Sequence, residues 1–172
     1  MLDIYIAVDS VINIVLMTKK IFLFLLLFSN TTYAVDCKRP NWNRCYKTVN
    51  NKCIDTRHYI LYRDGKSVKI NNKNKVISGA WNSYYSNKTI NNPKEIQIDH
   101  VLPWKFLRNN GDCTKAKEMI NDEENLVIAT KKENSSKSDR LDTPFKTNAP
   151  YKQKQCYICK KWKLRNCNLV CK

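Results

Sequence analysis

One short stretch of the sequence places an acid and an imidazole side by side just before a break in the chain. Asp99 and His100 lie among the apolar residues Ile96, Ile98 and Val101, and a proline closes the run. The apolar residues predict a short strand, and the proline predicts its end. We therefore expect a carboxylate and an imidazole at the mouth of a strand, where an oxygen ligand and a base can serve one site.

Two asparagines downstream extend this set. Asn125 opens a second apolar run over residues 126–129, and Asn134 lies nine residues after Asn125. Thr130 and Glu133 match the S/T-x-x-E capping box, which begins a helix. Asn134 is therefore expected in the first turn of a short helix. The predicted order is strand, strand and helix, each carrying one of these polar residues.

These residue types suit the hydrolysis of a phosphodiester bond. A histidine has an unperturbed pKa of about 6.5 and can take a proton from water near neutral pH. Asp99 and Asn134 offer oxygen atoms, which suit Mg²⁺ or Mn²⁺ better than Zn²⁺. One such ion polarises the phosphate and stabilises the leaving oxygen. We expect one Mg²⁺ or Mn²⁺ ion, because Mg²⁺ keeps several waters and needs few protein ligands.

The charge of the chain indicates a polyanionic partner. Its 172 residues include 31 Lys and Arg against 15 Asp and Glu, a formal charge of +16. Such an excess favours nucleic acid, an anionic membrane or an acidic glycan. We expect DNA or RNA, bound with little sequence preference and contacted by Lys131, Lys137 and Arg140. The alternative is a non-catalytic, secreted basic protein that binds nucleic acid or membranes and does not need His100.

The N-terminus is typical of an export signal. Two lysines precede the apolar run 21–28, and residues 32–34 offer small side chains at positions −3 and −1 of a cleavage site. Eight apolar residues are too few to span a bilayer, which needs about 20. We expect residues 1–34 to be removed, with Met17 as an alternative start of translation. The mature protein is expected to be secreted or periplasmic, without stable membrane insertion.

The cysteines predict a disulfide framework. All eight follow the expected cleavage site, at Cys37, Cys45, Cys53, Cys113, Cys156, Cys159, Cys167 and Cys171. An even number in an exported chain favours four bridges, whose pairing the sequence does not fix. The alternative is a zinc site made by the last four. The seven-residue spacer between Cys159 and Cys167 is short for such a site, and an oxidising compartment disfavours free thiolates.

The predicted organisation has three parts, an export signal over residues 1–34, a disulfide-stapled arm over residues 35–55 and one domain over residues 56–172. Within the domain, residues 56–63 are rich in β-formers, Asp64 and Gly65 favour a tight turn, and residues 67–70 supply a return strand. This pattern predicts an N-terminal β-hairpin. Residues 151–165 predict a basic amphipathic helix that closes the domain.

Three further residues with suitable chemistry are assigned structural positions. Tyr84 and Tyr85 lie among Asn and Ser residues. Aromatic rings can stack on bases, but in a small domain they more often fill the core. His58 has no evident partner nearby and is expected on a strand rather than at a site.

The strand–strand–helix order resembles the ββα-metal core of HNH endonucleases, and further segments extend the likeness. These segments are residues 56–57, 61–64, 78–81, 98–103, 121–122, 125–127, 134–139, 156–158 and 161–162. Together they are similar to the HNH domain related to the C-terminal part of GmrSD-type restriction enzymes (the DUF1524 group), including its secreted stand-alone members. The resemblance covers roughly residues 56–165.

The resemblance implies an α+β fold with a ββα-metal core and a secreted endonuclease activity. It implies that His100 is the general base and that Asn125 braces the histidine loop. It also implies that Asp99 and Asn134 hold the metal. The sequence departs from the HNH pattern in two places: HNH enzymes often carry a histidine where Asn134 stands, and Ser138 occupies a position that can carry a further histidine.

Overall fold

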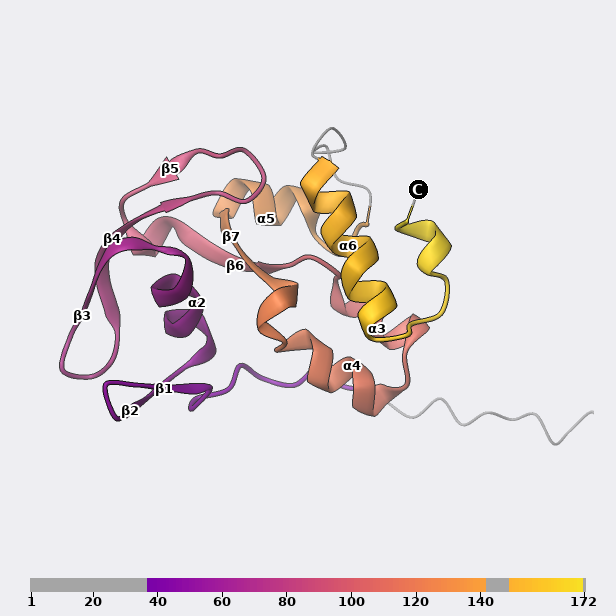
Figure 1. Ribbon diagram of the computed structural model, residues 1–172, viewed down its shortest axis with the longest axis horizontal. Helices are drawn as coiled ribbons and strands as arrows, with labels where there is room; N and C mark the ends of the chain where they lie inside the picture. The colour runs from indigo at the N-terminus through magenta and orange to yellow at the C-terminus, as the bar shows by residue number, and fades with distance from the viewer. Residues whose placement is uncertain (1–36, 142–148, 172) are drawn as a thin grey trace, which may run out of the picture. The chain divides into compact units, whose positions relative to one another are not determined.

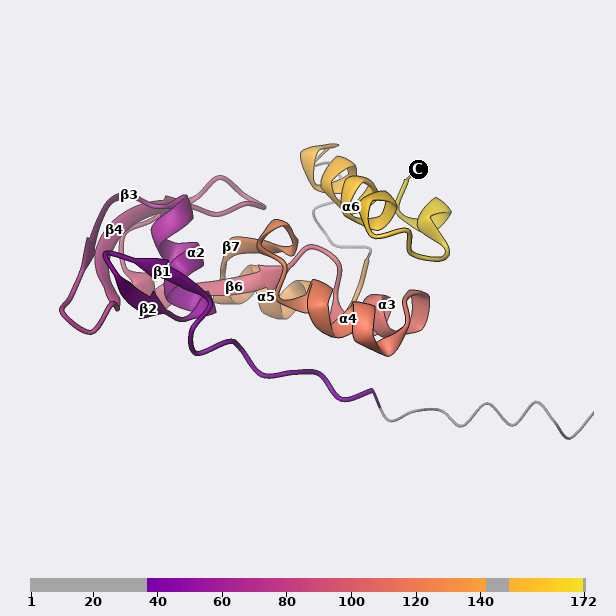
Figure 2. The same cartoon turned by 60° about the horizontal axis from the view of Figure 1, so that its bottom comes forward.

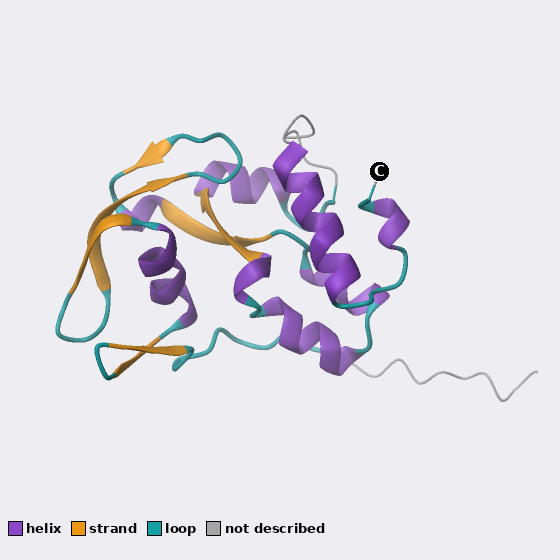
Figure 3. Cartoon of the chain, viewed as in Figure 1, coloured by secondary structure: helices purple, strands orange, loops and turns teal. Residues whose placement is uncertain are grey.

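The computed structural model describes residues 37–141 and 149–171, so the expected export signal lies outside the described residues. The described chain mixes five α-helices with small antiparallel sheets (Figures 1 and 3). In chain order its elements are β1 (Lys47–Val49), β2 (Lys52–Ile54), α2 (Thr56–Asp64), β3 (Lys66–Ile70), β4 (Val76–Asn82), β5 (Thr89–Ile90), η1 (Pro93–Glu95), β6 (Ile96–His100), α3 (Trp104–Asn110), α4 (Cys113–Ile120), η2 (Glu123–Asn125), β7 (Leu126–Thr130), α5 (Lys131–Lys137), α6 (Ala149–Lys161) and η3 (Cys167–Leu169). Across the described ranges, no helix has the length and apolar character needed to cross a bilayer.

The segment predicted as the first strand of a hairpin is the helix α2. The side chain of Asp55 accepts a hydrogen bond from the backbone N–H of His58 at 2.8 Å and caps the helix N-terminus. Ile60 and Leu61 are fully buried on one side of the helix. The cap and this burial outweigh the β propensity of the residues, which is a weak and context-dependent preference. The predicted hairpin over residues 56–70 is therefore wrong.

The hairpin in the structure joins β3 to β4, and β5 pairs with the far end of β4. In its loop, the side-chain oxygen of Asn71 accepts two backbone N–H groups, and Asn74 has a φ of 55°. Asparagine tolerates this left-handed conformation better than most residues. Trp81 on β4 donates its indole N–H to the carbonyl of Leu61 at 2.7 Å, which fastens the hairpin to α2.

The predicted strand–strand–helix order is present as β6, β7 and α5. The two strands pair antiparallel with Asp99 opposite Val127, and α5 packs against both (Figures 1 and 2). The predicted capping box is confirmed. The hydroxyl of Thr130 accepts the N–H of Glu133 at 3.2 Å, and the Glu133 carboxylate accepts the N–H of Thr130 at 2.8 Å. These contacts fix where α5 begins.

The β6–β7 pair lies between two apolar clusters. Side chains alternate along a strand, so each strand presents two faces. Ile96 and Ile98 join the cluster that contains α2 and β4. Gln97 and Asp99 therefore point to the opposite face. On β7, Val127 and Ala129 belong to the other cluster, which includes α3, α4 and α6. The alternation places the acid of the Asp99–His100 pair inside the domain.

Two helices flank the site on its C-terminal side as the sequence partly indicates. The helix α4 follows α3 in the chain, and the predicted closing helix over residues 151–165 is α6. The helix α3 was not predicted, because Pro103 was interpreted only as the end of a strand. In the structure Pro103 is the N-cap of α3. A proline stops a strand and is also tolerated at a helix start, so its meaning depends on the residues after it.

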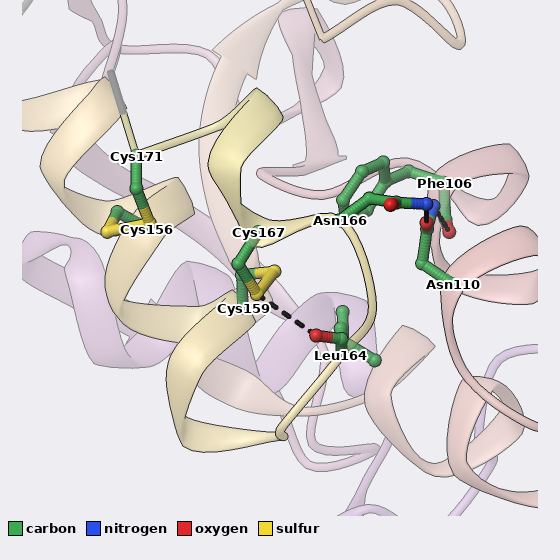
Figure 4. The surroundings of a disulfide bond; sticks show 8 residues. All are labelled: Phe106, Asn110, Cys156, Cys159, Leu164, Asn166, Cys167 and Cys171. Atoms are coloured by element: carbon green, nitrogen blue, oxygen red, sulfur yellow. Dashed lines mark hydrogen bonds between the residues drawn. A yellow bond between two sulfur atoms is a disulfide. The ribbon is translucent and has the colours of Figure 1, made fainter.

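The predicted disulfide framework is confirmed. The four bonds are Cys37–Cys113, Cys45–Cys53, Cys156–Cys171 and Cys159–Cys167. The last two join α6 to η3 and the residues beyond it (Figure 4). The last four cysteines thus pair with one another and leave no thiolates for the alternative zinc site. Beside them, Asn166 donates to the side chain of Asn110 at 2.8 Å, which ties the C-terminal turn to α3.

Candidate active site

A pocket of about 290 Å³ opens where β6 ends beside α5. Its lining residues are Arg39, Ile98, Asp99, His100, Pro103, Trp104, Asn134, Ser135, Ser138 and Asp139. Three residues predicted from the sequence therefore meet in one place, namely Asp99, His100 and Asn134. A larger cavity of about 850 Å³ beside Phe106 and Lys152 contains none of the predicted catalytic or metal-binding residues.

Asp99 is almost completely buried and has several partners. Its Oδ2 accepts a hydrogen bond from the hydroxyl of Tyr85, and its Oδ1 accepts the backbone N–H of His100 at 2.7 Å. The ammonium of Lys137 lies 3.3 Å from both carboxylate oxygens. Burial, and then the charge of Asp99, raise the pKa of Tyr85, which keeps its proton available to the carboxylate. The carboxylate is therefore held in one orientation by three donors.

Lys137 is fully buried, although the sequence suggested a contact with nucleic acid. Its Nζ also donates to the carbonyl of His100 at 2.7 Å. Burial lowers the pKa of Lys137, and the neighbouring Asp99 carboxylate opposes that shift. In this structure Lys137 is thus the counterion of Asp99 and not a surface cation. Lys131 and Arg140 are exposed, and the Arg140 guanidinium donates to the carbonyl of Ser136.

The His100 imidazole is 7 % exposed and has one nitrogen without a partner. Its Nε2 is the only buried side-chain nitrogen or oxygen without a hydrogen bond in the described part of the chain. The ring makes a hydrogen bond with the backbone of Ile120, which Nδ1 must provide because Nε2 has no partner. Burial, and then the charges of Arg39 and Lys137, lower the pKa of His100 to about 3. The imidazole is therefore neutral at neutral pH, the state that a general base requires.

The indole of Trp42 stacks on the His100 ring. The ring centroids are 5.2 Å apart and the planes are inclined by 26°. Trp42 comes from the segment before β1, more than fifty positions earlier in the chain. No local pattern in the sequence connects the two residues, and the contact was not predicted.

Asn134 lies in α5 with its amide group oriented by Gln97. Its Nδ2 donates to Oε1 of Gln97 at 2.6 Å, which leaves its amide oxygen as the atom available to a ligand. Gln97 lies on β6 two positions before Asp99, so both side chains are on the face that α5 covers. The alternation along β6 was the signal that could have identified Gln97.

Asn125 lies outside the pocket and joins the loop after His100 to the start of β7. It is fully buried. Its Oδ1 accepts the N–H of Leu102 at 2.7 Å, and its Nδ2 donates to the carbonyls of Leu102 at 3.1 Å and Met119 at 3.3 Å. These bonds fix the loop that follows His100.

The donor atoms in the pocket fit a hard divalent cation. Asp99 and Asn134 supply carboxylate and amide oxygens, the ligands that Mg²⁺ and Mn²⁺ prefer. In the described residues, no three His, Cys, Asp or Glu side chains gather as a metal cluster, so an all-protein site of the zinc type does not fit. A hard ion that keeps water ligands fits better. Such an ion and the Lys137 ammonium would share the same carboxylate.

A comparison with known families identifies the family of the chain. Residues 42–167 match the family model described as the C-terminal domain of GmrSD restriction endonucleases. The chain belongs to this family, which confirms the resemblance stated from the sequence motifs.

A curated relative is an "Uncharacterized secreted protein" of Arthroderma benhamiae, 28% identical over 131 residues. The aligned region is 73% of this chain and 61% of the relative, so the chain spans less than two thirds of the relative's length. No solved structure shows a significant match.

Proposed function

We propose that the protein is an extracellular, metal-dependent endonuclease of the HNH type that cleaves nucleic acid with little sequence preference. One observation carries the proposal. The unpartnered Nε2 of a neutral His100 shares a pocket with the oxygens of Asp99 and Asn134. Membership of the GmrSD C-terminal family supports the same reaction class. The β6–β7–α5 unit would then be a ββα-metal core.

The compartment follows from the disulfides and the relative. All eight cysteines are paired, and such density is typical of proteins that fold in oxidising surroundings. The curated relative is named as secreted. Both observations support a location outside the cytoplasm, which is also what the predicted export signal implies.

In the proposed reaction, His100 removes a proton from the attacking water. The water oxygen forms a bond to phosphorus, the bond from phosphorus to the 3′ oxygen breaks, and the water proton moves to Nε2. The hydrogen bond to Ile120 holds the ring in the orientation that presents Nε2. Asp99 and Asn134 would hold the divalent ion, which supplies charge stabilisation for the phosphate and the leaving oxygen. The loop bonds made by Asn125 keep His100 aligned with both residues.

The basic surface supplies substrate affinity. A formal charge of +16 attracts phosphates irrespective of base sequence. Counterion release then gives strong salt dependence, with a slope near −0.9 per phosphate contact on duplex DNA. Lys131 and Arg140, exposed on and beside α5, are the predicted contacts near the pocket.

The test is cleavage by the oxidised protein of plasmid DNA and of RNA, with Mg²⁺, with Mn²⁺ and with EDTA. We expect cleavage that needs the metal and that falls about 10²–10⁴-fold in His100→Ala, the usual contribution of a positioned base. Binding should persist in this variant. The control is His58→Ala, which removes the other histidine; His58 does not line the pocket, and its Nδ1 accepts the N–H of Val76 at 3.0 Å.

Metal-independent cleavage would contradict the proposed mechanism, as would full turnover by His100→Ala. Tight binding of nucleic acid without any cleavage would instead favour the non-catalytic basic protein.

A further inference from the structure

The segment before β1 lies across the pocket of His100. From here on the name arm is limited to residues 37–46, the described part of the predicted arm that precedes β1; Figure 2 shows its extended path into β1. The arm is fixed at one end by the disulfide between Cys37 and Cys113, the first residue of α4. Five residues later it is fixed again, by the stacking of Trp42 on His100. Its last residue, Tyr46, donates its hydroxyl to the carbonyl of Asn121 at 2.7 Å.

Arg39 lies between the first two of these anchors and lines the pocket. Among the described residues around the pocket it is the one cationic side chain. It is exposed and makes no hydrogen bond or ion pair with any residue that the structure describes. The following residue, Pro40, restricts the backbone further. The backbone at Arg39 is thus anchored on both sides, and the guanidinium lines the pocket without bonding to a described protein group.

Two other basic residues, at the end of α5 and just after it, already bond to protein groups, and Lys131 does not line the pocket. Lys137 is buried against Asp99, and Arg140 bonds to backbone carbonyls at the end of α5. The exposed rim of the pocket is formed by Arg39 together with Ser135, Ser138 and Asp139, and Asp139 forms no ion pair with Arg39. A phosphate that enters from this rim meets a guanidinium first. Its planar donors match phosphate oxygens in pairs.

We propose that Arg39 binds the substrate phosphate at the active site and that the Cys37–Cys113 disulfide positions it there. This inference rests on the proposed endonuclease function. Attack on phosphorus gathers negative charge on the phosphate oxygens, and a guanidinium beside them stabilises that charge. Both Cys37 and Arg39 precede residues 42–167, the region that matches the family model. The proposed contact therefore lies outside the region that matches the family model.

The test measures equilibrium binding of a labelled DNA duplex across a salt series, with His100 intact and with EDTA present to prevent metal-dependent cleavage. Arg39→Ala should weaken binding about tenfold, the effect of losing one charge-assisted contact, and should lower the salt slope by about 0.9. Arg39→Lys should keep the slope and recover part of the affinity, because it retains the charge but not the paired donors.

The matched control is Arg44→Ala. Arg44 is exposed on the same arm but lines a different pocket, beside Asp55 and Arg57. It should change binding less than about twofold, as expected for a diffuse surface charge. Equal losses of affinity for Arg39→Ala and Arg44→Ala would overturn the proposal, because the effect would then come from net charge and not from a specific contact.

The disulfide is tested by replacing Cys37 and Cys113 together with serine. This variant should lose as much affinity as Arg39→Ala, and adding Arg39→Ala to it should cause no further loss, because both changes remove one contact. Additive losses would overturn the positioning role. Thermal unfolding confirms that each variant is folded at the assay temperature.

The failure of this inference and of the proposed function are distinguishable. If the wild type cleaves nucleic acid and Arg39→Ala binds and cleaves equally well, the role of Arg39 is overturned. The proposed endonuclease function is then retained. Binding that depends on Arg39 in a protein that never cleaves would overturn the endonuclease and support Arg39 as a phosphate contact.

Discussion

The two ends of the domain are both tied by disulfides, but the bonds serve different purposes. Cys37–Cys113 spans 76 positions and brings the arm to the pocket. Cys156–Cys171 and Cys159–Cys167 span 15 and 8 positions and fasten η3 to α6. The residues they tie enter the apolar core rather than the pocket. The long connection therefore positions chemistry, whereas the short connections complete a scaffold. Changes at the site should alter activity, and changes at the scaffold should alter stability.

The largest stability effect is expected at Lys137, because its buried contact with Asp99 also stabilises the fold. Lys137→Met keeps the volume but leaves the buried carboxylate of Asp99 without its counterion. Removing one partner of a buried pair typically costs about 3–5 kcal/mol. Denaturant unfolding measures this loss. Lys131→Met, on the exposed side of the same helix, is the control and should stay within about 0.5 kcal/mol of wild type.

Adding Asp99→Asn to Lys137→Met removes the unpaired charge and should recover part of the stability. If the double variant is less stable than Lys137→Met alone, the pair is not the source of the loss. That outcome would mean that changes at the site and changes at the scaffold do not differ in how they affect stability.

Replacing Cys156 and Cys171 with serine should affect stability alone. A closed loop of about 15 residues contributes about 3 kcal/mol through the entropy of the unfolded chain. The expected loss is therefore of this size, measured by denaturant unfolding. Cleavage should be unchanged at temperatures where the variant is folded. A loss of cleavage in the folded variant would show that the C-terminal disulfides also shape the site.

A smaller and purely functional effect is expected for Gln97→Ala, which frees the amide of Asn134. Partners that orient a metal ligand typically contribute 10–100-fold to metal affinity. The Mg²⁺ concentration that gives half-maximal cleavage should therefore rise by about this factor, with little change in maximal rate. Isothermal titration with Mn²⁺ provides a readout that is independent of turnover. Unchanged metal affinity would remove Gln97 from the positioning of Asn134.

Local patterns in the sequence predicted the central elements. The capping box of Thr130 and Glu133 acts over four residues, and the apolar run of β7 is continuous, so both are readable without tertiary information. The helix α2 was predicted as a strand because its residues are mostly β-formers and show no strong helical pattern. The cap at Asp55 was its available signal.

The partners of the site residues could not be predicted in this way. Tyr85 and Lys137 lie 14 and 38 positions from Asp99, and their contacts depend on how β6 meets α5. The lysine was expected at the surface because lysines usually are. The buried acid opposite it is the physical reason for the exception, and only the three-dimensional arrangement reveals it.

The length of the Cys37–Cys113 connection also sets the order of events when the protein is made. The arm emerges before every other described element, yet its covalent anchor emerges only after β6 and α3 have been made. Until that sulfur is made and oxidised, no covalent bond fixes the arm beside His100, and the arm depends on the Trp42 stacking and the Tyr46 hydrogen bond. A newly made chain in a reducing compartment therefore holds an unfinished pocket. The proposed phosphate contact is therefore completed only where thiols are oxidised.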